Sequence, residues 1–333
     1  MLVLMFGLLA SLSAETVALT RDGKISVGKL PAPAQAVAVM NLGVVAPSNQ
    51  DGAVLLRDGS RSIGIPATLD LKQVVVRCDR LGERSFPLDQ VAELRLGPGI
   101  DLPRPIGFTG AIFVNGDSLA GSIAFIDQTN VGLNTGKRVA SIPRSRVAAV
   151  VLAPVGAGSE GWRVLLDSGD RLIGRMEGGA TWKLSGPDLV LPLDRGWSCA
   201  WYQGAEVRPL STLPLKGLSP AIALDRFHDG RPLSARGRPY GHGLAVRGQA
   251  VLQVATGGAG RLLGEVAVLE GREVRVRVLV DGREVWTASP HSDEVPTVID
   301  AVLGAGGELS VEISAPAAAG APLVVLGWPT LVR

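Results

Sequence analysis

Cysteine and histidine are scarce in this chain, which contains two cysteines and three histidines among its 333 residues. Cys78 and Cys199 lie far apart, and neither CxxC nor a Cys/His ligand spacing occurs, which argues against a structural zinc site. The histidines form no HExxH motif and no serine lies in a GxSxG turn, so acid–base and nucleophilic groups are few. These absences predict a protein that is not an enzyme and needs no metal or cofactor. They leave open whether the two cysteines pair.

Strong charge of one sign is also lacking, because 33 lysines and arginines oppose 31 acidic residues, for a net charge of +2. Such a balance provides no general attraction to nucleic acid or to an anionic membrane. The apolar run Met1–Ala14 is shorter than the roughly 18 residues that a spanning helix needs, and its small residues at the end are typical of a secretory signal. We therefore expect cleavage near Ala14, a mature chain without a transmembrane segment, and export to the periplasm, the cell surface or the medium.

Glycine and proline are abundant instead, with 43 and 22 residues dispersed along the chain. Apolar residues make up 46% of the sequence, which is enough to bury cores. Many short apolar runs separated by turn residues predict an all-β fold. The length allows two or three domains.

Residues 15–205 repeat a loose pattern, in which an apolar run leads to a turn with glycine and a second glycine follows five positions later. The four copies are Asp22-Gly23…Gly28, Asp58-Gly59…Gly64, Asn115-Gly116…Gly121 and Ser168-Gly169…Gly174. Asp-Gly and Asn-Gly between apolar runs predict hairpins in which both turn residues adopt positive φ. A second mark follows in the two middle copies, with a partial echo in the last: Phe86-Pro87-x-x-x-Val91, Ile142-Pro143-x-x-x-Val147 and Leu191-Pro192.

A period of roughly fifty residues indicates a repeated module. The pattern resembles small Sm-like or SH3-like barrels, in which the second strand bends at a glycine and the final strand follows the proline. The first copy is shorter, so we expect a partial or edge unit. RNA binding by such barrels needs clustered Lys/Arg and exposed aromatic side chains. Here arginine is mixed with Asp and Glu, and Phe113 and Phe125 lie in apolar runs, which predicts spacers or protein contacts and no nucleic-acid partner.

One motif in the repeats mimics a cofactor site. Gly156–Gly161 matches the dinucleotide fingerprint GxGxxG, which requires a helix after it. Trp162–Gly169 has the pattern of another strand and turn. We interpret the motif as a linker between repeats.

Residues 206–333 have the pattern of an antiparallel sandwich. Arg272–Trp286 alternates apolar and polar residues around Asp281-Gly282, which predicts a hairpin with a type I′ turn. Alternation over Glu308–Ser314 predicts a further strand. Because the boundary near Gly204 separates two patterns, we expect residues 206–333 to fold alone.

Six landmarks follow one another in this last third. They are Arg208-Pro-Leu-Ser, Asp225-Arg226, Gly230-x-Pro232-Leu233, Tyr240-x-x-Gly243-Leu244, Asp281-Gly282 with Trp286, and Trp328. Their order and spacing resemble the NPCBM/NEW2 family of carbohydrate-binding modules. The resemblance implies a galactose-binding-like jelly-roll β-sandwich and binding of a glycan or cell-surface polysaccharide. The chain departs from the family at Arg247, where histidine is common, and before Trp328, where aspartate is frequent.

The segment from Asp225 to Arg247 concentrates charged and aromatic side chains, and we expect the ligand site there. Arginine offers a fork of donors to hydroxyls or carboxylates, and tyrosine or histidine stacks on the apolar face of a sugar. The candidates are Asp225, Arg226, His228, Arg238, Tyr240, His242 and Arg247. The alternative is a solvated loop that Asp225 and Arg226 pin to the body of the domain. Trp286 and Trp328 are expected to fill a core.

The sequence therefore predicts an exported, non-catalytic protein of a bacterial type that binds a glycan or a cell surface. Its expected architecture is a series of tandem small β-barrel-like repeats followed by a jelly-roll sandwich. The alternative is a structural or protein-interaction module that keeps the sandwich fold without binding sugar, with another protein as its partner.

Overall fold

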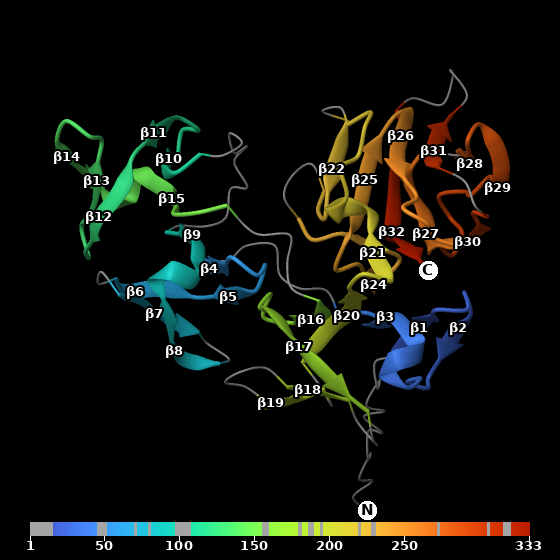
Figure 1. Cartoon of the computed structure of the whole chain (residues 1–333), viewed down its shortest axis with the longest axis horizontal. Coiled ribbons are helices and arrows are strands. Elements are labelled where there is room, and N and C mark those ends of the chain that lie inside the picture. Colours follow the sequence, from blue (N-terminus) through green and yellow to red (C-terminus); the bar gives the residue numbers. More distant parts are fainter. Residues whose placement is uncertain are drawn as a thin grey trace, which may run out of the picture.

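The computed structural model describes residues 16–44, 52–69, 72–78, 81–96, 108–154, 160–178, 182–185, 190–193, 196–218, 221–227, 231–271, 274–304, 307–315 and 321–333. Within these ranges the chain forms β-strands and short 3₁₀ helices without any α-helix, which confirms the all-β class. The 3₁₀ helices are η1 (Pro33–Gln35), η2 (Leu88–Gln90), η3 (Arg144–Arg146) and η4 (Leu210–Thr212). The expected signal, Met1–Ala14, lies outside the described residues. Figure 1 shows two groups of small β-units and a larger sandwich, coloured yellow to red.

The four copies of the repeat correspond to four units in the structure. The first unit contains β1 (Thr16–Thr20), β2 (Ile25–Val27) and β3 (Ala36–Asn41). The second contains β4 (Ala53–Leu56), β5 (Arg61–Ile63), β6 (Ile65–Leu69), β7 (Gln73–Cys78), β8 (Gly82–Pro87) and β9 (Val91–Arg95). The third contains β10 (Gly110–Phe113), β11 (Ser118–Ala120), β12 (Ser122–Ile126), β13 (Asn130–Asn134), β14 (Val139–Pro143) and β15 (Val147–Val151). The fourth contains β16 (Gly161–Leu166), β17 (Arg171–Glu177), β18 (Lys183–Ser185), β19 (Val190–Pro192) and β20 (Trp197–Gln203).

Each unit opens with the same tight turn at the first glycine of the repeat. In the second unit, Gly59 donates its N–H to Leu56 O at 3.0 Å, and Leu56 donates its own to Ser60 O at 2.8 Å. The equivalent bonds recur in the other three units. In each turn the glycine has a φ between 82° and 93°, whereas the residue before it does not adopt positive φ. The expectation of two positive-φ residues is therefore wrong for these turns, because a type I turn that closes with a glycine bulge needs only one.

In the second, third and fourth units the second glycine of the repeat lets two strands approach closely, whereas at Gly28 of the first unit nothing lies within 4 Å of an added Cβ. A Cβ at Gly64 would lie 2.0 Å from Arg77 O, and one at Gly174 would lie 2.4 Å from Ser185 O. Gly121 occupies the equivalent place in the third unit, between β11 and β12. Because a side chain does not fit there, the second strand bends at a glycine, as the repeat predicts. The strand β16 begins at Gly161, so the GxGxxG motif leads into a strand and not into a helix.

The units associate in pairs through their final strands. β15 of the third unit pairs with β9 of the second, and β20 of the fourth pairs with β3 of the first. The pairs are joined where β5 meets β17, at Arg61 and Arg171. One sheet therefore runs through all four units in the order β11-β10-β15-β9-β4-β5-β17-β16-β20-β3-β1-β2. The pairing is nested, because the two middle units associate with each other and the two outer units do the same.

The last third forms two stacked sheets. The inner sheet faces the first and fourth units, which we call the barrel units after the sequence prediction alone. It contains β21 (Val207–Pro209), β22 (Ile222–Leu224), β25 (Gly243–Arg247), β27 (Arg261–Glu270), β30 (Thr297–Val302) and β32 (Leu323–Val332). The outer sheet contains β26 (Ala250–Ala255), β28 (Arg275–Val280), β29 (Arg283–Ala288) and β31 (Glu308–Ser314). A short ribbon of β23 (Ser234–Ala235) and β24 (Arg238–Pro239) lies beside them. At the tip of the β28–β29 hairpin, Asp281 and Gly282 have φ values of 48° and 80°, which confirms the predicted I′-type turn.

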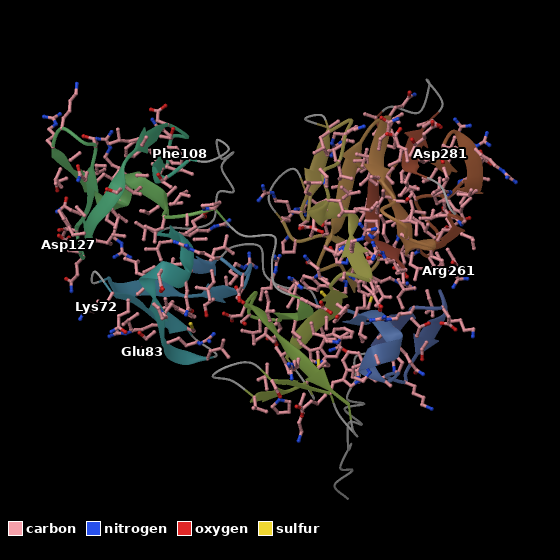
Figure 2. All side chains as sticks on the ribbon, in the orientation of Figure 1. Lys72, Glu83, Phe108, Asp127, Arg261 and Asp281 are labelled. Carbon is pink, nitrogen blue, oxygen red and sulfur yellow. The ribbon has the colours of Figure 1, made fainter. Side chains whose placement is uncertain are left out.

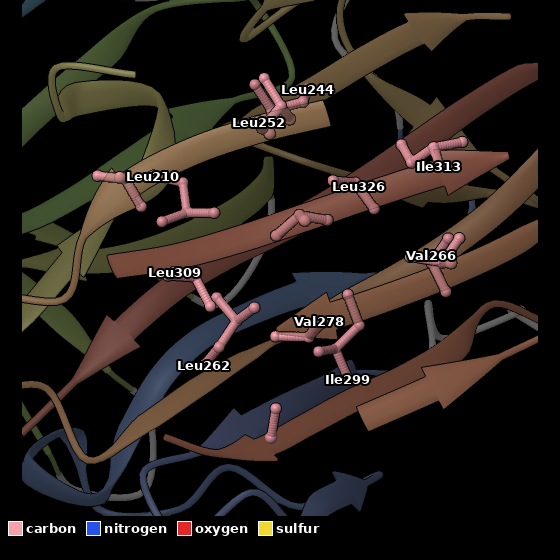
Figure 3. Packing of buried hydrophobic residues seen from close by; sticks show 14 of the residues in the cluster. Leu210, Leu244, Leu252, Leu262, Val266, Val278, Ile299, Leu309, Ile313 and Leu326 are labelled. Atoms are coloured by element: carbon pink, nitrogen blue, oxygen red, sulfur yellow. The ribbon is translucent and has the colours of Figure 1, made fainter. Parts of the chain in front are cut away.

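Apolar side chains of the two sheets meet in one core. Leu262, Val266 and Leu326 of the inner sheet face Val278 and Leu309 of the outer sheet in this cluster (Figure 3). Trp286 packs against the same cluster and is partly buried. The alternation in β28 and β31 therefore has the predicted origin, with every second residue in the core.

A second core lies between the inner sheet and the barrel units. It combines Met40 and Trp201 of the first and fourth units with residues of the inner sheet such as Leu263, Val325 and Trp328. At the rim, Arg261 pairs with Asp300 at 3.4 Å and lies near the first unit (Figure 2). The sheet formed by the first and fourth units is covered on both faces, because Trp162 and Val164 of β16 belong to a separate core on the side away from the sandwich. The molecule thus has successive layers, in which the inner sheet is sandwiched between barrel units and outer sheet.

Candidate functional site

The segment from Asp225 to Arg247 lies on the barrel-facing side of the sandwich. Asp225 has a φ of 58°, and its Oδ1 accepts a hydrogen bond from Gly243 N at 3.0 Å. Its own N–H donates to Gly243 O at 2.9 Å. This reciprocal pair fixes the start of the segment to the start of β25. The geometry matches the pinning role that the sequence leaves open for Asp225.

Arg238 and Tyr240 meet at a carboxylate that the sequence reasoning missed. Glu265, in the middle of β27, is 1% exposed. It accepts an ion-pair hydrogen bond from Arg238 and a hydrogen bond from Tyr240 Oη at 2.8 Å. Burial raises the pKa of Glu265, and the Arg238 guanidinium opposes that shift. Burial and the neighbouring carboxylate hold the pKa of Tyr240 well above its usual value. The triad therefore holds the segment to the inner sheet and does not face solvent.

His242 lies against an aromatic ring of the fourth unit. Its imidazole is 3% exposed, and its centroid is 5.8 Å from that of Trp201. Burial, with smaller effects from Arg171 and Arg163, lowers the pKa of His242 to about 3. The side chain is therefore neutral at physiological pH and is not suited to proton transfer there. Burial raises the pKa of the nearby Cys199 thiol to about 12, so this cysteine is not a nucleophile either.

Trp328 completes the buried side of the segment. It is fully buried, as predicted, and its ring makes an edge contact with Tyr240 at 5.6 Å between centroids. Its φ of 52° is unusual for a bulky residue, and the pairing of β27 with β32 shifts register at this point. A β-bulge here turns the ring toward the barrel units.

The predicted site residues do not converge on one solvent-facing place. Tyr240 and His242 were expected to offer rings to a sugar, but the barrel units and the inner sheet cover both. Arg247 lies at the far end of β25, where it pairs with Glu270 at 3.0 Å. Arg226 is partly exposed and forms an isolated bridge to Pro232. His228 lies outside the described residues.

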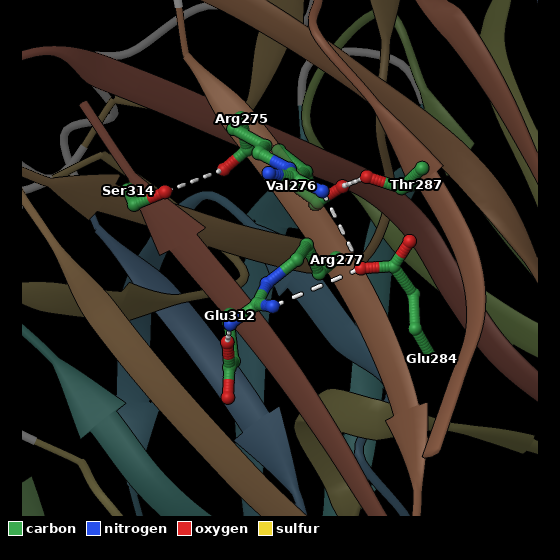
Figure 4. Close-up of polar contacts among 7 residues, drawn as sticks. All are labelled: Arg275, Val276, Arg277, Glu284, Thr287, Glu312 and Ser314. Carbon is green, nitrogen blue, oxygen red and sulfur yellow. Dashed lines mark hydrogen bonds and ion pairs between the residues drawn. The ribbon is translucent and has the colours of Figure 1, made fainter. Parts of the chain in front are cut away.

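A continuous row of solvated polar side chains lies on the free face of the outer sheet (Figure 4). Arg277 pairs with Glu312 on one side and with Glu284, at 3.8 Å, on the other. Arg275 also reaches Glu284, at 3.6 Å. In register, Glu312 is opposite both Arg277 and Val251. We call this surface the outer polar face, with Gln253, Thr287 and Ser310 as its further members.

Metal-ligand clusters and membrane-spanning helices are both absent from the described residues. They contain no group of three or more His, Cys, Asp or Glu side chains placed to hold a metal. Among the same residues, no helix is long and apolar enough to cross a bilayer. Cys78 and Cys199 are both buried, in different cores, and form no disulfide with each other.

No protein-family model matches the chain, and no curated protein matches it. Among solved structures, it is similar to the CBM51 module of a GH95 protein from Clostridium perfringens, in complex with methyl-galactose. That match has 14% identity, covers 38% of this chain and 99% of the other, and has a TM-score of 0.33. The tandem CBM51 modules of a family 98 glycoside hydrolase from Streptococcus pneumoniae match with 11% identity, over 95% of this chain and 88% of the other, at a TM-score of 0.33.

A third similar structure contains the CBM51-2 and INT domains of ZmpB from Clostridium perfringens. Its identity is 12% and its TM-score 0.34, and the match covers 46% of this chain but only 36% of that protein. At identities of 11–14% and TM-scores of 0.33–0.34 these matches carry no statement about what this chain binds.

Proposed function

We propose that the chain is an exported, non-catalytic protein that binds a glycan through the outer polar face of its sandwich. The observation that carries the proposal is the solvent-facing row of forked hydrogen-bonding groups around Arg277. A sugar presents adjacent hydroxyls that each donate and accept, and planar guanidinium, carboxylate and amide groups match such pairs. Among the described residues, the barrel units cover much of the outward face of the inner sheet, and its exposed ion pairs, such as Arg247–Glu270, lie at its margins.

The charges on this face are held in place before any ligand arrives. Arg277 is 38% exposed and has a carboxylate on each side, while Glu312 and Glu284 are 27% and 36% exposed. A side chain that is already ordered loses less conformational entropy on binding. The half-exposed Val251 lies opposite Glu312 among these groups and provides apolar contact for the C–H surface of a ring. The face therefore combines fixed polar groups with a small apolar area, as sugar sites require.

The experiment is a glycan array on the full chain, followed by calorimetric titration with the best glycan. We expect Arg277→Gln to melt like the parent and to lower the affinity by about tenfold to a hundredfold, as expected for loss of a charge-assisted hydrogen bond. Arg77→Gln, on the exposed face of β7 in the second unit, is the matched control and should bind like the parent. Arg226→Ala and Arg247→Ala test the solvent-facing part of the predicted segment. If these two variants lose affinity and Arg277→Gln does not, the site lies in that segment.

A second function, a structural or protein-interaction module, is favoured by one observation. The landmark side chains Tyr240 and Trp328 lie in the core shared with the barrel units, and Tyr240 and the candidate Arg238 both bind the buried Glu265. A sandwich whose role is to make these contacts does not need to bind a sugar. If no glycan on the array binds the parent, this function replaces the first.

A further inference from the structure

A cleft of about 210 Å³ lies where the second unit meets the fourth. Its polar walls come from the β4–β5 turn, β8 and β17, and contain Asp58, Ser60, Arg61, Arg84, Ser85 and Arg171. Leu172, Ile173 and Phe86 form its apolar side. The cleft is therefore formed by two units and lies outside the sandwich.

Positive charge dominates these walls. Three guanidinium groups, those of Arg61, Arg84 and Arg171, face one carboxylate, that of Asp58. Ser60 donates both its N–H and its hydroxyl to that carboxylate, at 2.7 and 3.1 Å. The neighbouring Asp170 is 1% exposed, and its oxygens accept hydrogen bonds from Ile63 N and Ser168 Oγ. The nearby acidic groups thus have partners of their own.

Two of the arginines are directly opposed across the strand joint. Arg61 and Arg171 are Cα partners at the point where β5 meets β17. Like charges directly opposite one another destabilise a strand pair. Arg61 directs Nε and Nη2 to Gly169 O at 3.2 and 2.7 Å. Arg171 has its guanidinium 5.5 Å from the centre of the Trp201 ring, and its buried Nε has no hydrogen-bond partner among the described residues.

Arg84 provides the third donor group from the opposite wall. Its guanidinium lies 4.9 Å from the centre of the Phe86 ring, and Nη1 is 3.5 Å from Ser62 Oγ. Stacking on an aromatic ring holds a guanidinium flat and leaves its in-plane N–H groups available to an acceptor. No carboxylate pairs with Arg84 in the ion pairs of the described residues.

We propose that this cleft binds a small oxyanion, a carboxylate, sulfate or phosphate group, between Arg61, Arg84 and Arg171. Planar guanidinium groups bind such anions through paired hydrogen bonds. The cleft is smaller than the roughly 300–1,000 Å³ of pockets for drug-sized ligands, so it accepts a single group or one acidic ring. The bound anion offsets the repulsion between Arg61 and Arg171 and links the two pairs of units. The proposal goes beyond glycan binding by the sandwich and does not depend on it.

The test measures melting of the full chain and calorimetric titration with three probes: sodium sulfate, inorganic phosphate and glucuronate. Sodium chloride at equal ionic strength is the reference. An anion that binds the folded chain raises the melting temperature according to its concentration relative to Kd. We expect at least one probe to raise it above the chloride reference. We expect Arg84→Gln to weaken that binding by about tenfold or more, while Arg77→Gln binds like the parent.

Each outcome decides the proposal. If glucuronate alone raises the melting temperature above the chloride reference, an acidic sugar is the source of the oxyanion. If sulfate and phosphate raise it equally, the ligand is a free inorganic anion. The proposal is overturned if the melting temperature with every probe equals that in chloride. It is also overturned if Arg84→Gln shows the same increase in melting temperature as the parent. Arg171→Gln gives a second test if Arg84→Gln does not fold. Because these readouts use no neutral glycan, a negative glycan array leaves them unaffected.

Discussion

Gly241 offers the sharpest test of the contact between the sandwich and the barrel units. A Cβ at this position would lie 2.1 Å from Cζ3 and 2.4 Å from Cε3 of Trp201. Gly241 is not among the glycines with positive φ, so alanine is not strained there by its backbone conformation. Trp201 is 2% exposed and has Arg171 and His242 against its ring, so it has little room to move. The substitution Gly241→Ala therefore tests packing alone.

Overpacking of this kind costs about 1–3 kcal/mol. For chains of this class each kcal/mol lowers the melting temperature by about 2–4 °C, which gives a decrease of about 2–12 °C in a thermal scan. The control is Gly260→Ala, because the only contact of a Cβ there is Val332 O at 4.0 Å. We expect that control to melt within about 2 °C of the parent, because surface changes usually cost no more than about 0.5 kcal/mol.

A double-mutant cycle identifies the clashing partner. Trp201→Ala alone should cost about 3–5 kcal/mol, as for other buried aromatic residues. In that background the added methyl of Gly241→Ala has space, so its own cost should fall to nearly zero. An equal cost of Gly241→Ala with and without the tryptophan would refute the packing of the segment on the fourth unit.

Four further predictions concern charge, domain boundary and processing. The free energy of unfolding should decrease as the pH falls from 6.5 toward 3, because His242 takes up a proton below about 6.5 in the unfolded chain but only near 3 in the folded one. Urea unfolding should show a decrease of up to about 5 kcal/mol, and His242→Leu should make the decrease smaller. Glu265→Ala should cost about 3–5 kcal/mol in denaturant unfolding, since it leaves a mostly buried arginine unpaired, whereas Glu270→Ala, in an exposed pair, should cost about 0–1 kcal/mol. A fragment of residues 206–333 should melt cooperatively, because the core between its two sheets lies within the fragment, yet it should bind an apolar dye through the face that the barrel units cover. A non-cooperative melt would contradict the domain boundary. Mass spectrometry of the native protein should find an N-terminus at or near Glu15, and an intact Met1 in a cytoplasmic fraction would contradict export.

Local features of the fold were predictable from the sequence, and contacts between distant segments were not. The glycine pairs located turns and bends because tight turns and close strand crossings restrict the residue type at one position. The alternation in Glu308–Ser314 predicted the strand with those bounds. His242 is buried against Trp201, which belongs to another unit, and Tyr240 is buried against Trp328 and Glu265; no periodicity within the segment reports these contacts. One signal was present but unused: Glu265 is a charge in the middle of the apolar strand β27, and a buried charge requires a partner.

The buried polar segment also changes what a substitution there can reveal. Replacing Tyr240 with alanine removes an aromatic residue that is 2% exposed and leaves Glu265 with one partner fewer. A loss of binding in that variant would therefore report a loss of folding. Arg277, which is 38% exposed, is the better probe of function for the same reason.

The nested pairing of the units has a consequence for synthesis on the ribosome. The second and third units are neighbours in sequence, so β9 and β15 can pair soon after both have left the exit tunnel. The first unit, although made earliest, keeps the pairing edge of β3 open until β20 of the fourth unit is translated. Pairing between strands so distant in sequence closes a long loop and is slow. The first unit is therefore the part of the nascent chain that most needs protection from aggregation, and a chaperone would act there first.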